Sequence, residues 1–211
     1  MHWAKAWFDV AWNKRVQRNA NAMTLVTVDA EHRPSARIVL CKGFEADPGY
    51  LVFYTNYRSR KIAELDTNPH VGLVFHWDAI GRQIRIEGLA CRSPDEESDR
   101  YFATRDAGSQ LGAWASDQSS PLASRQDLLD QMATRATELG VELDDEGRPA
   151  EDSVIARPPH WGGIRVWANR VELWIEGADR IHDRACWTRS LTRQDDDTFE
   201  TGDWTGTRLQ P

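Results

Sequence analysis

The sequence predicts an α+β protein built on a β-barrel, and three features support this fold class. Strand-like apolar runs dominate both ends of the chain, helical patterns are inserted between them, and breaks that contain Pro or Gly separate neighbouring strands. A length of 211 residues suits one domain, because β-barrels of this size often stay undivided. We therefore expect a single domain over residues 1–211.

The N-terminal part is predicted to contain one helix and then a series of strands. Trp3, Trp7 and Val10 recur at helical spacing, so residues 2–18 should form an amphipathic helix. Two breaks that contain Pro, 31–34 and 46–49, separate runs that are most simply joined as a β-meander. The predicted strands are 23–30, 35–43, 50–56, 70–77 and 82–92, and a short helix over 60–67 is capped by Ser59.

The C-terminal part is predicted to change from helices back to strands. Ser93-Pro-Asp-Glu96 has the pattern of a capping box with Pro at the first helical position, which predicts a helix to about Thr104. Further helices are expected over 109–115 and 124–139, and the acidic stretch 140–157 is typical of a surface loop. The remaining predicted elements are strands 163–167, 170–175 and 184–189, an acidic turn at 195–197 and a last strand that ends at Pro211.

Composition argues against several classes of function. The net charge of −7 argues against a nucleic-acid partner, for which a basic face would be expected. No apolar run approaches the roughly 18 residues that span a bilayer, and no hydrophobic signal segment precedes the first charges, so we expect no membrane association. Cys41, Cys91 and Cys186 are far apart and lack CxxC spacing, so neither a metal site nor a disulfide framework is expected. A cytoplasmic location follows as the expectation.

Basic and amide side chains lie in or beside apolar, strand-like runs. A buried cation is costly unless an anion meets it, so this placement in an acidic chain predicts pockets for small anions, phosphate monoesters above all. At a predicted helix start, Ser59, Arg60 and Lys61 add a hydroxyl and two cations to exposed backbone N–H groups, which favours an anion. A cap followed by solvated charges is the alternative. The stretches concerned are 37–42, 54–61, 82–83, 118–119, 161–166 and 180–184.

Arg37 and Lys42 bracket four apolar residues and lie five positions apart. On a regular strand they would point to opposite faces, so two anionic ligands, one on each face, fit this spacing better than one shared ligand. A strand with charged ends at the rim of a sheet is the alternative.

Spacing also brings other polar side chains together. Gln83 alternates with apolar neighbours and should share a face with other polar residues, although an exposed sheet face has the same pattern. Tyr101 and Arg105 share one face of the predicted helix, where a simple packing pair is the alternative. Arg180 and His182 are two apart in a predicted extended run and should also share a face.

The order and the amino-acid sequences of these stretches resemble those of the flavin-dependent pyridoxamine/pyridoxine 5′-phosphate oxidases over nearly the whole chain. The resemblance implies a mostly antiparallel, Greek-key-like split β-barrel that binds FMN, in a homodimer with FMN at the subunit interface. It also implies oxidation of pyridoxamine 5′-phosphate and/or pyridoxine 5′-phosphate to pyridoxal 5′-phosphate. O2 would be the electron acceptor, and hydrogen peroxide, with ammonia from the amine, would be released.

The resemblance also implies a role for particular residues. Trp174 and Arg184 would reach FMN from the other subunit, and Arg180 and His182 would cover the substrate ring as the catalytic positions. The FMN contacts implied are Arg37, Ile38, Val39, Leu40, Lys42, Tyr54, Thr55, Ser59, Arg60, Lys61, Gln83, Gln118, Ser119, Trp174 and Arg184. The substrate contacts implied are Lys42, Tyr101, Arg105, Ser109, Arg180 and His182.

The chain departs from the family pattern at several points. Met1 falls close to the first helix, so an N-terminal arm that closes over the substrate is expected to be missing or shortened. Arg105-Asp106 stands where the family usually has Arg-Pro, the loop before Arg157 is long, and residues 167–169 replace a turn that usually contains Pro. Two alternatives stay open: a split-barrel flavin oxidase with another substrate, such as the phenazine-pathway type, and a non-enzymatic binder of flavin or pyridoxal phosphate.

Overall fold

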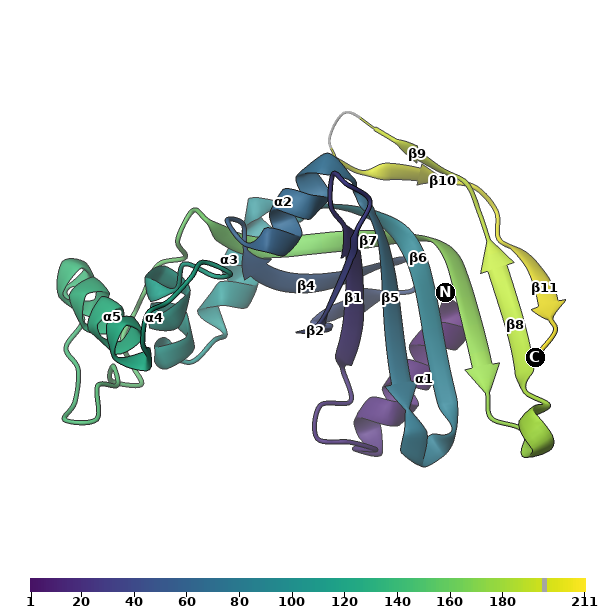
Figure 1. The fold of residues 1–211 in the computed structure, drawn as a ribbon, viewed down its shortest axis with the longest axis horizontal. Coiled ribbons are helices and arrows are strands. Elements are labelled where there is room, and N and C mark those ends of the chain that lie inside the picture. The colour runs from purple at the N-terminus through teal and green to yellow at the C-terminus, as the bar shows by residue number, and fades with distance from the viewer. Residues whose placement is uncertain (195–196) are drawn as a thin grey trace. The chain divides into compact units, whose positions relative to one another are not determined.

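The computed structural model describes residues 1–194 and 197–211, which form a curled antiparallel sheet and several helices (Figure 1). This arrangement confirms the predicted α+β class. The chain divides into two compact units. Unit 1 contains residues 1–53, 64–92 and 164–211, and unit 2 contains residues 54–63 and 93–163.

The elements are numbered along the chain. The helices are α1 (His2–Asn13), α2 (Arg60–Thr67), α3 (Asp95–Ala103), α4 (Ala107–Ala115) and α5 (Arg125–Leu139), with single 3-10 turns at Asp78–Ile80 and Ala178–Arg180. The strands are β1 (Ala22–Val28), β2 (Pro34–Leu40), β3 (Gly43–Glu45), β4 (Tyr50–Asn56), β5 (His70–Trp77), β6 (Arg82–Arg92), β7 (Trp161–Ile175), β8 (Asp183–Thr188), β9 (Leu191–Arg193), β10 (Phe199–Thr201) and β11 (Thr205–Leu209).

Unit 1 contains the core of the sheet. The strand order is β11-β8-β7-β6-β5-β1-β2, and β4 pairs with both β3 and β7. Burial alternates along β5, where Leu73, Phe75 and Trp77 are buried, because successive side chains of a strand point to opposite faces. Phe8 of α1 packs with its ring centroid 5.6 Å from that of Phe75 and 5.4 Å from that of Phe44, which holds α1 against the sheet.

Unit 2 contains the helical insertion. Helix α5 agrees with the helix predicted over 124–139. Ser124 caps it in a reciprocal capping box with Asp127, and Gly140 ends it in a left-handed conformation (φ 68°). Residues 140–157 form no helix or strand beyond one isolated bridge between Leu143 and Pro149, which agrees with the predicted loop.

Several predictions for the N-terminal half were wrong for local reasons. Helix α1 ends at Asn13 rather than at residue 18, because Arg15 takes a left-handed conformation (φ 49°) that stops the helix. The predicted strand 35–43 is two strands, since β2 ends at Leu40 and the backbone N–H of Lys42 donates to the carbonyl of Val52 (2.8 Å). Because β4 pairs with β3 and β7, the predicted meander does not extend to it.

Strand β7 is one long strand where two strands and a turn at 167–169 were predicted. Its register against β6 shifts between residues 87 and 88, which lie opposite Arg170 and Ala168. Asn169 is therefore the extra residue of a β-bulge. Beside the bulge, the backbone N–H of Ala168 donates to the carbonyl of Gly49 (3.1 Å), so this residue stays hydrogen-bonded.

The predicted capping box at Ser93 was also wrong. Pro94 is the N-cap of α3, and the hydroxyl of Ser93 is buried without a hydrogen-bond partner among the described residues. The backbone N–H of Ser93 donates to the carbonyl of Gly163 (2.9 Å), so Ser93 pairs with β7 rather than capping the helix. The short strands β9 and β10 were not predicted, and Asp195 and Asp196 of the predicted acidic turn lie outside the described residues.

Candidate functional site

Four polar side chains of unit 2 converge at the start of α2. The ammonium of Lys61 donates to Thr55 Oγ1 (3.0 Å), to Ser59 Oγ (3.0 Å) and to Gln118 Oε1 (2.7 Å). The hydroxyl of Thr55 also donates to Gln118 Oε1 (2.9 Å). Lys61 is only 8 % exposed, so its charge is poorly screened by water. The sequence singled out all four residues, and the structure brings them together as a cationic cluster at a helix N-terminus, which suits an anion.

Arg37, on β2 of unit 1, lies in a second polar network. Its Nη1 donates to Thr27 Oγ1 (2.5 Å) and to the Leu25 carbonyl (3.3 Å), and its Nη2 donates to Ser35 Oγ (2.5 Å) and to Glu64 Oε2 (3.0 Å). Glu64 is 4 % exposed and also accepts from Thr27. A guanidinium has five N–H groups, and among the described residues these contacts leave the Nε–H of Arg37 for a ligand.

The other residues of the 37–42 stretch differ in exposure, and Cys41 is buried. Side chains 38–40 alternate between exposed and half-buried, and Ile38 is 64 % exposed. Lys42 lies beyond the end of β2, so the expectation that Arg37 and Lys42 occupy opposite faces of one regular strand was wrong. Lys42 instead lines a cavity of about 520 Å³ together with Trp12 of α1.

Three of the predicted flavin contacts form a row across neighbouring strands of unit 1. Gln83 on β6 lies directly opposite Trp174 on β7, and Trp174 lies directly opposite Arg184 on β8. Directly opposite residues share one face of a sheet, so an amide, an indole and a guanidinium are presented side by side. The ring of His182 packs on Trp174, with 4.6 Å between the centroids.

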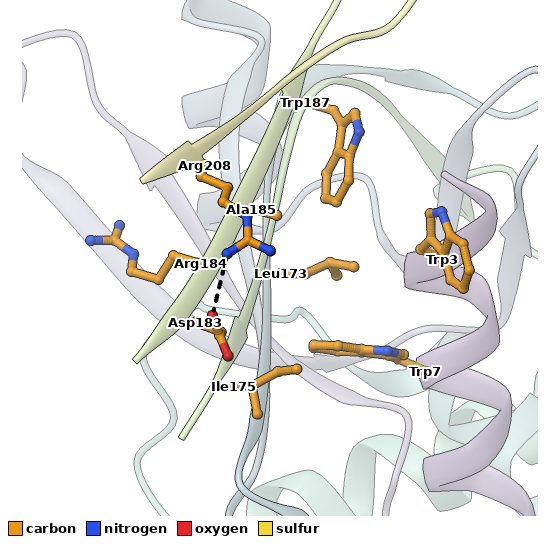
Figure 2. A pocket seen from close by; sticks show the side chains of 9 residues that line it. All are labelled: Trp3, Trp7, Leu173, Ile175, Asp183, Arg184, Ala185, Trp187 and Arg208. Carbon is orange, nitrogen blue, oxygen red and sulfur yellow. Dashed lines mark ion pairs between the residues drawn. The ribbon is translucent and has the colours of Figure 1, made fainter. Parts of the chain in front are cut away.

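A buried carboxylate holds one end of this row. Both Nε and Nη2 of Arg184 contact Glu172 Oε1 at 2.8 Å, and Glu172 is 3 % exposed. Glu172 also pairs with Arg85, at 3.3 Å. Arg184 also lines a cavity of about 360 Å³ together with Trp3 and Trp187, and Figure 2 shows its side chain turned away from these two rings.

The segment before β8 is a tight turn, and the predicted extended run was wrong there. Residues 178–180 form a 3-10 turn in which Asp179 (φ 55°) and Arg180 (φ 64°) are both left-handed. A Cβ on Gly177 would lie 1.8 Å from the Ile181 carbonyl oxygen, so the turn requires glycine. The N–H of Gly177 donates to His182 Nδ1 (3.2 Å), which orients the imidazole, whereas Arg180 is exposed. Consecutive left-handed residues of this kind are often found at functional sites.

An aromatic stack in unit 2 brings together two of the predicted phosphate-binding residues, Tyr101 and Arg105. Ring centroids of Tyr54 and Tyr101 lie 3.9 Å apart, and those of Tyr54 and Trp161 lie 5.4 Å apart. The guanidinium carbon of Arg105 lies 4.6 Å from the Trp161 ring centroid. Trp161 lies in one of the stretches singled out from the sequence, but no role was predicted for it. Its ring contacts both Tyr101 and Arg105.

Arg105 has an unsatisfied donor. Helix α3 ends at Ala103, so Arg105 is not on the helix and the predicted shared helical face was wrong. Its Nη1 is buried and has no hydrogen-bond partner among the described residues. Burial lowers the pKa of this guanidinium, although Tyr101 and Asp106 raise it. A buried cationic donor without an acceptor is costly, and a bound anion would remove that cost.

The remaining predicted site residues lie at element ends. Ser109 is the third residue of α4, and its backbone N–H donates to Asp106 Oδ1 (2.7 Å). Arg60 is the exposed first residue of α2, and Ser119 is exposed with a left-handed backbone (φ 77°).

None of the described helices is long and apolar enough to cross a membrane, and the described residues contain no group of three or more metal-ligating side chains.

Comparisons with known proteins agree with this geometry. Residues 12–139 match the family model described as pyridoxamine 5′-phosphate oxidase, and residues 161–211 match the one described as pyridoxine 5′-phosphate oxidase C-terminal dimerisation region. A pyridoxine/pyridoxamine 5′-phosphate oxidase of Rubrobacter xylanophilus is 45% identical over 97% of this chain and 83% of its own length.

Two solved structures share the fold. PhzG from Burkholderia lata 383, in complex with tetrahydrophenazine-1-carboxylic acid, is 28% identical with a TM-score of 0.79, over 100% of this chain and 91% of its own. A pyridoxamine 5′-phosphate oxidase-related, FMN binding protein from Nostoc punctiforme PCC 73102 has a TM-score of 0.72 at 16% identity, over 99% and 97% of the two chains. The chain therefore belongs to the pyridoxamine 5′-phosphate oxidase family, and it is an oxidoreductase of that type.

Proposed function

We propose that this protein oxidises pyridoxamine 5′-phosphate and/or pyridoxine 5′-phosphate to pyridoxal 5′-phosphate, with FMN as cofactor and O2 as acceptor. Hydrogen peroxide is the second product, and ammonia is released when the substrate is the amine. The observation that carries the proposal is the unsatisfied Nη1 of Arg105, which lies over Trp161 beside Tyr101 and is suited to a phosphate ester. The name of the Rubrobacter relative supports the same substrate class.

The chemistry of the donor sets fits FMN. Lys61, Ser59 and Arg60 would hold the phosphate at the start of α2, and Arg37 is a further proposed contact of FMN. Gln83 would face the polar edge of the flavin ring, because an amide both donates and accepts. When bound, FMN supplies the two-electron acceptor for the oxidation and passes the electrons to O2. The proposed set is completed by residues 38–40, Lys42, Tyr54, Thr55, Gln118, Ser119, Trp174 and Arg184.

On the substrate side, the protein's part is to bind and orient. Arg105, Tyr101 and Ser109 would hold the phosphate, which fixes the rest of the molecule, and Lys42 is a further proposed contact of the substrate. His182 accepts the Gly177 N–H at Nδ1, so its neutral ring would carry a proton on Nε2 that can face the substrate. Arg180, in its left-handed turn, would cover the ring from the same segment.

We also propose that the protein works as a cytoplasmic homodimer of single-domain chains, with FMN between subunits. The match of residues 161–211 to a dimerisation region supports this assembly. Gln83 would then serve the flavin of its own chain, while Trp174 and Arg184, its neighbours in the row, would serve the flavin of the other chain. The row would thus lie at the interface.

A second candidate is oxidation of a phenazine precursor, which the likeness to PhzG favours. Anaerobic mixing of FMN-loaded protein with pyridoxamine 5′-phosphate, pyridoxine 5′-phosphate or a reduced phenazine carboxylate separates the two. We expect either B6 phosphate to bleach the flavin absorbance, and pyridoxine without the phosphate to do so far more weakly. Bleaching by the phenazine compound alone would reject the B6 assignment. Protein that binds FMN but is bleached by none of them would indicate a binder without oxidase activity.

A further inference from the structure

Asp106 places a carboxylate at the start of α4, beside two residues proposed for the substrate phosphate. It is the N-cap of this nine-residue helix, and its Oδ1 accepts the backbone N–H of Ser109 (2.7 Å). Hydrogen bonds from the Ser109 hydroxyl and backbone N–H lower the pKa of Asp106, so it is ionised near neutral pH. Both donors of Ser109 are thus directed at an anion that belongs to the protein.

The adjacent residue, Arg105, carries the opposite charge, and one of its donors is unsatisfied. Its Nη1 is buried and has no hydrogen-bond partner among the described residues, while its guanidinium is held over Trp161 (4.6 Å) and Phe102 (5.5 Å). Asp106 is exposed, so its carboxylate stays on the water side of the same short segment. The segment therefore offers an unsatisfied cation and, next to it, a fixed negative charge that already uses the neighbouring hydroxyl and amide.

We infer that Asp106 is a specificity-determining residue that weakens binding of dianionic phosphate esters, because its carboxylate competes with the phosphate for the donors of Ser109. This inference rests on the proposed function for its assignment of Arg105 and Ser109 to the substrate phosphate. A phosphate that reaches Arg105 must displace Asp106 from Ser109 or bind beside a like charge. Ligands with a single negative charge, such as carboxylates, meet about half of that repulsion.

The simpler role of Asp106 is to cap α4, and one substitution separates the two roles. Asn is as good an N-cap as Asp, since its side-chain oxygen accepts the same backbone N–H. Asp106→Asn therefore keeps the cap and removes the charge. Asp130→Asn makes the same change in net charge at an exposed residue of α5 that accepts a hydrogen bond from the side chain of Gln126 (2.8 Å), and it serves as the control.

The experiment measures binding to FMN-loaded protein by calorimetry, using pyridoxal 5′-phosphate and pyridoxal as a pair that differs only in the phosphate. The exposed carboxylate of Asp106 repels the two negative charges of the phosphate. We therefore expect Asp106→Asn to bind pyridoxal 5′-phosphate roughly tenfold more tightly. Its affinity for pyridoxal should not change. In turnover, KM for the B6 phosphates should fall by a similar factor with kcat unchanged, because the charge acts on ground state and transition state alike.

Equal affinity of parent and Asp106→Asn for pyridoxal 5′-phosphate would overturn the inference and leave Asp106 as a cap. An equal gain in Asp130→Asn would overturn it as well, since net charge alone would then explain the change. Inorganic phosphate, followed by 31P line broadening, distinguishes this failure from failure of the proposed function. Tighter phosphate binding by Asp106→Asn, in a protein that binds no B6 compound, would support the charge effect and reject the B6 substrate.

Discussion

Replacing Lys61 with Met tests the proposed cofactor site most directly. The substitution keeps an apolar stem of similar length and removes the ammonium that contacts Thr55, Ser59 and Gln118. Lys61 is 8 % exposed, so solvent screens its charge little, and a charge-assisted contact to phosphate there should contribute about 1.5–3 kcal/mol. That range corresponds to a loss of roughly tenfold to a hundredfold in FMN affinity.

The fold should tolerate this change. Gln118 Oε1 still accepts the hydroxyl of Thr55 after the ammonium is gone, and the hydroxyl of Ser59 can rotate toward another partner. We therefore expect a loss of at most about 1 kcal/mol in stability, which is roughly 2–4 °C in Tm for a chain of this size. A larger loss would mean that the ammonium mainly holds unit 2 together.

Titration of apoprotein with FMN and with riboflavin, followed by quenching of flavin fluorescence, provides the measurement. Riboflavin has no phosphate, so its affinity should be the same in the parent and in Lys61→Met. Lys5→Met, which removes an ion pair with Asp9 (2.7 Å) on α1, controls for the loss of one positive charge. The assignment of Lys61 fails if the variant binds FMN within about twofold of the parent, or if riboflavin binding falls equally.

Three further predictions concern sharing of the site, division of roles and pH. Arg184→Ala and Arg60→Ala should each weaken FMN binding. A mixed dimer of one chain of each variant should regain one intact site and part of the activity. If proven subunit exchange restores no activity, each site is built within one chain. Arg105→Ala should mainly raise KM, whereas Arg180→Ala should also lower kcat, by about a hundredfold if the substrate shifts by about 1 Å, and both should stay yellow. A colourless Arg180→Ala would assign that residue to the flavin. Burial lowers the pKa of His160 below 6.5, so the unfolded chain binds a proton that the folded chain resists. Stability should be full above about pH 6.5 and fall below it, and a plot of Tm against pH that His160→Gln does not flatten would contradict this.

Local sequence patterns predicted those parts of the fold that depend on local chemistry. The bounds of β4, β5, β6 and α2 agree with prediction, because alternation, a Pro-Gly break and an Asn-Pro stop leave one solution for each. The bulge at Asn169 and the pairing of β4 with β7 could not be predicted, because both depend on hydrogen bonds between distant residues. Sequence spacing likewise misplaced Arg105, which lies past the end of its helix.

For the candidate site, the sequence identified cations better than their partners. Lys61 and Gln118 were named from sequence and lie 2.7 Å apart at Nζ and Oε1. Glu64 and Glu172, which contact Arg37 and Arg184, were missed, because a Glu between apolar residues looks like any half-exposed position until the fold shows that it is buried. The assignment of residues to FMN and substrate stays a prediction.

The bulge in β7 has a consequence for how this chain can change in length over evolution. Trp167 and Trp174 are seven residues apart, so a regular strand would put them on opposite faces, yet they lie opposite Leu89 and Gln83, which share one face of β6. One inserted residue therefore sets the parity of the rest of the strand. Deletion of Asn169 should turn Trp174 toward the apolar face and abolish FMN binding, whereas Asn169→Ala should retain it, as flavin titration of both variants would show. In descendants of this chain, we expect the loss of one residue from β7 to be tolerated less well than a substitution in this strand.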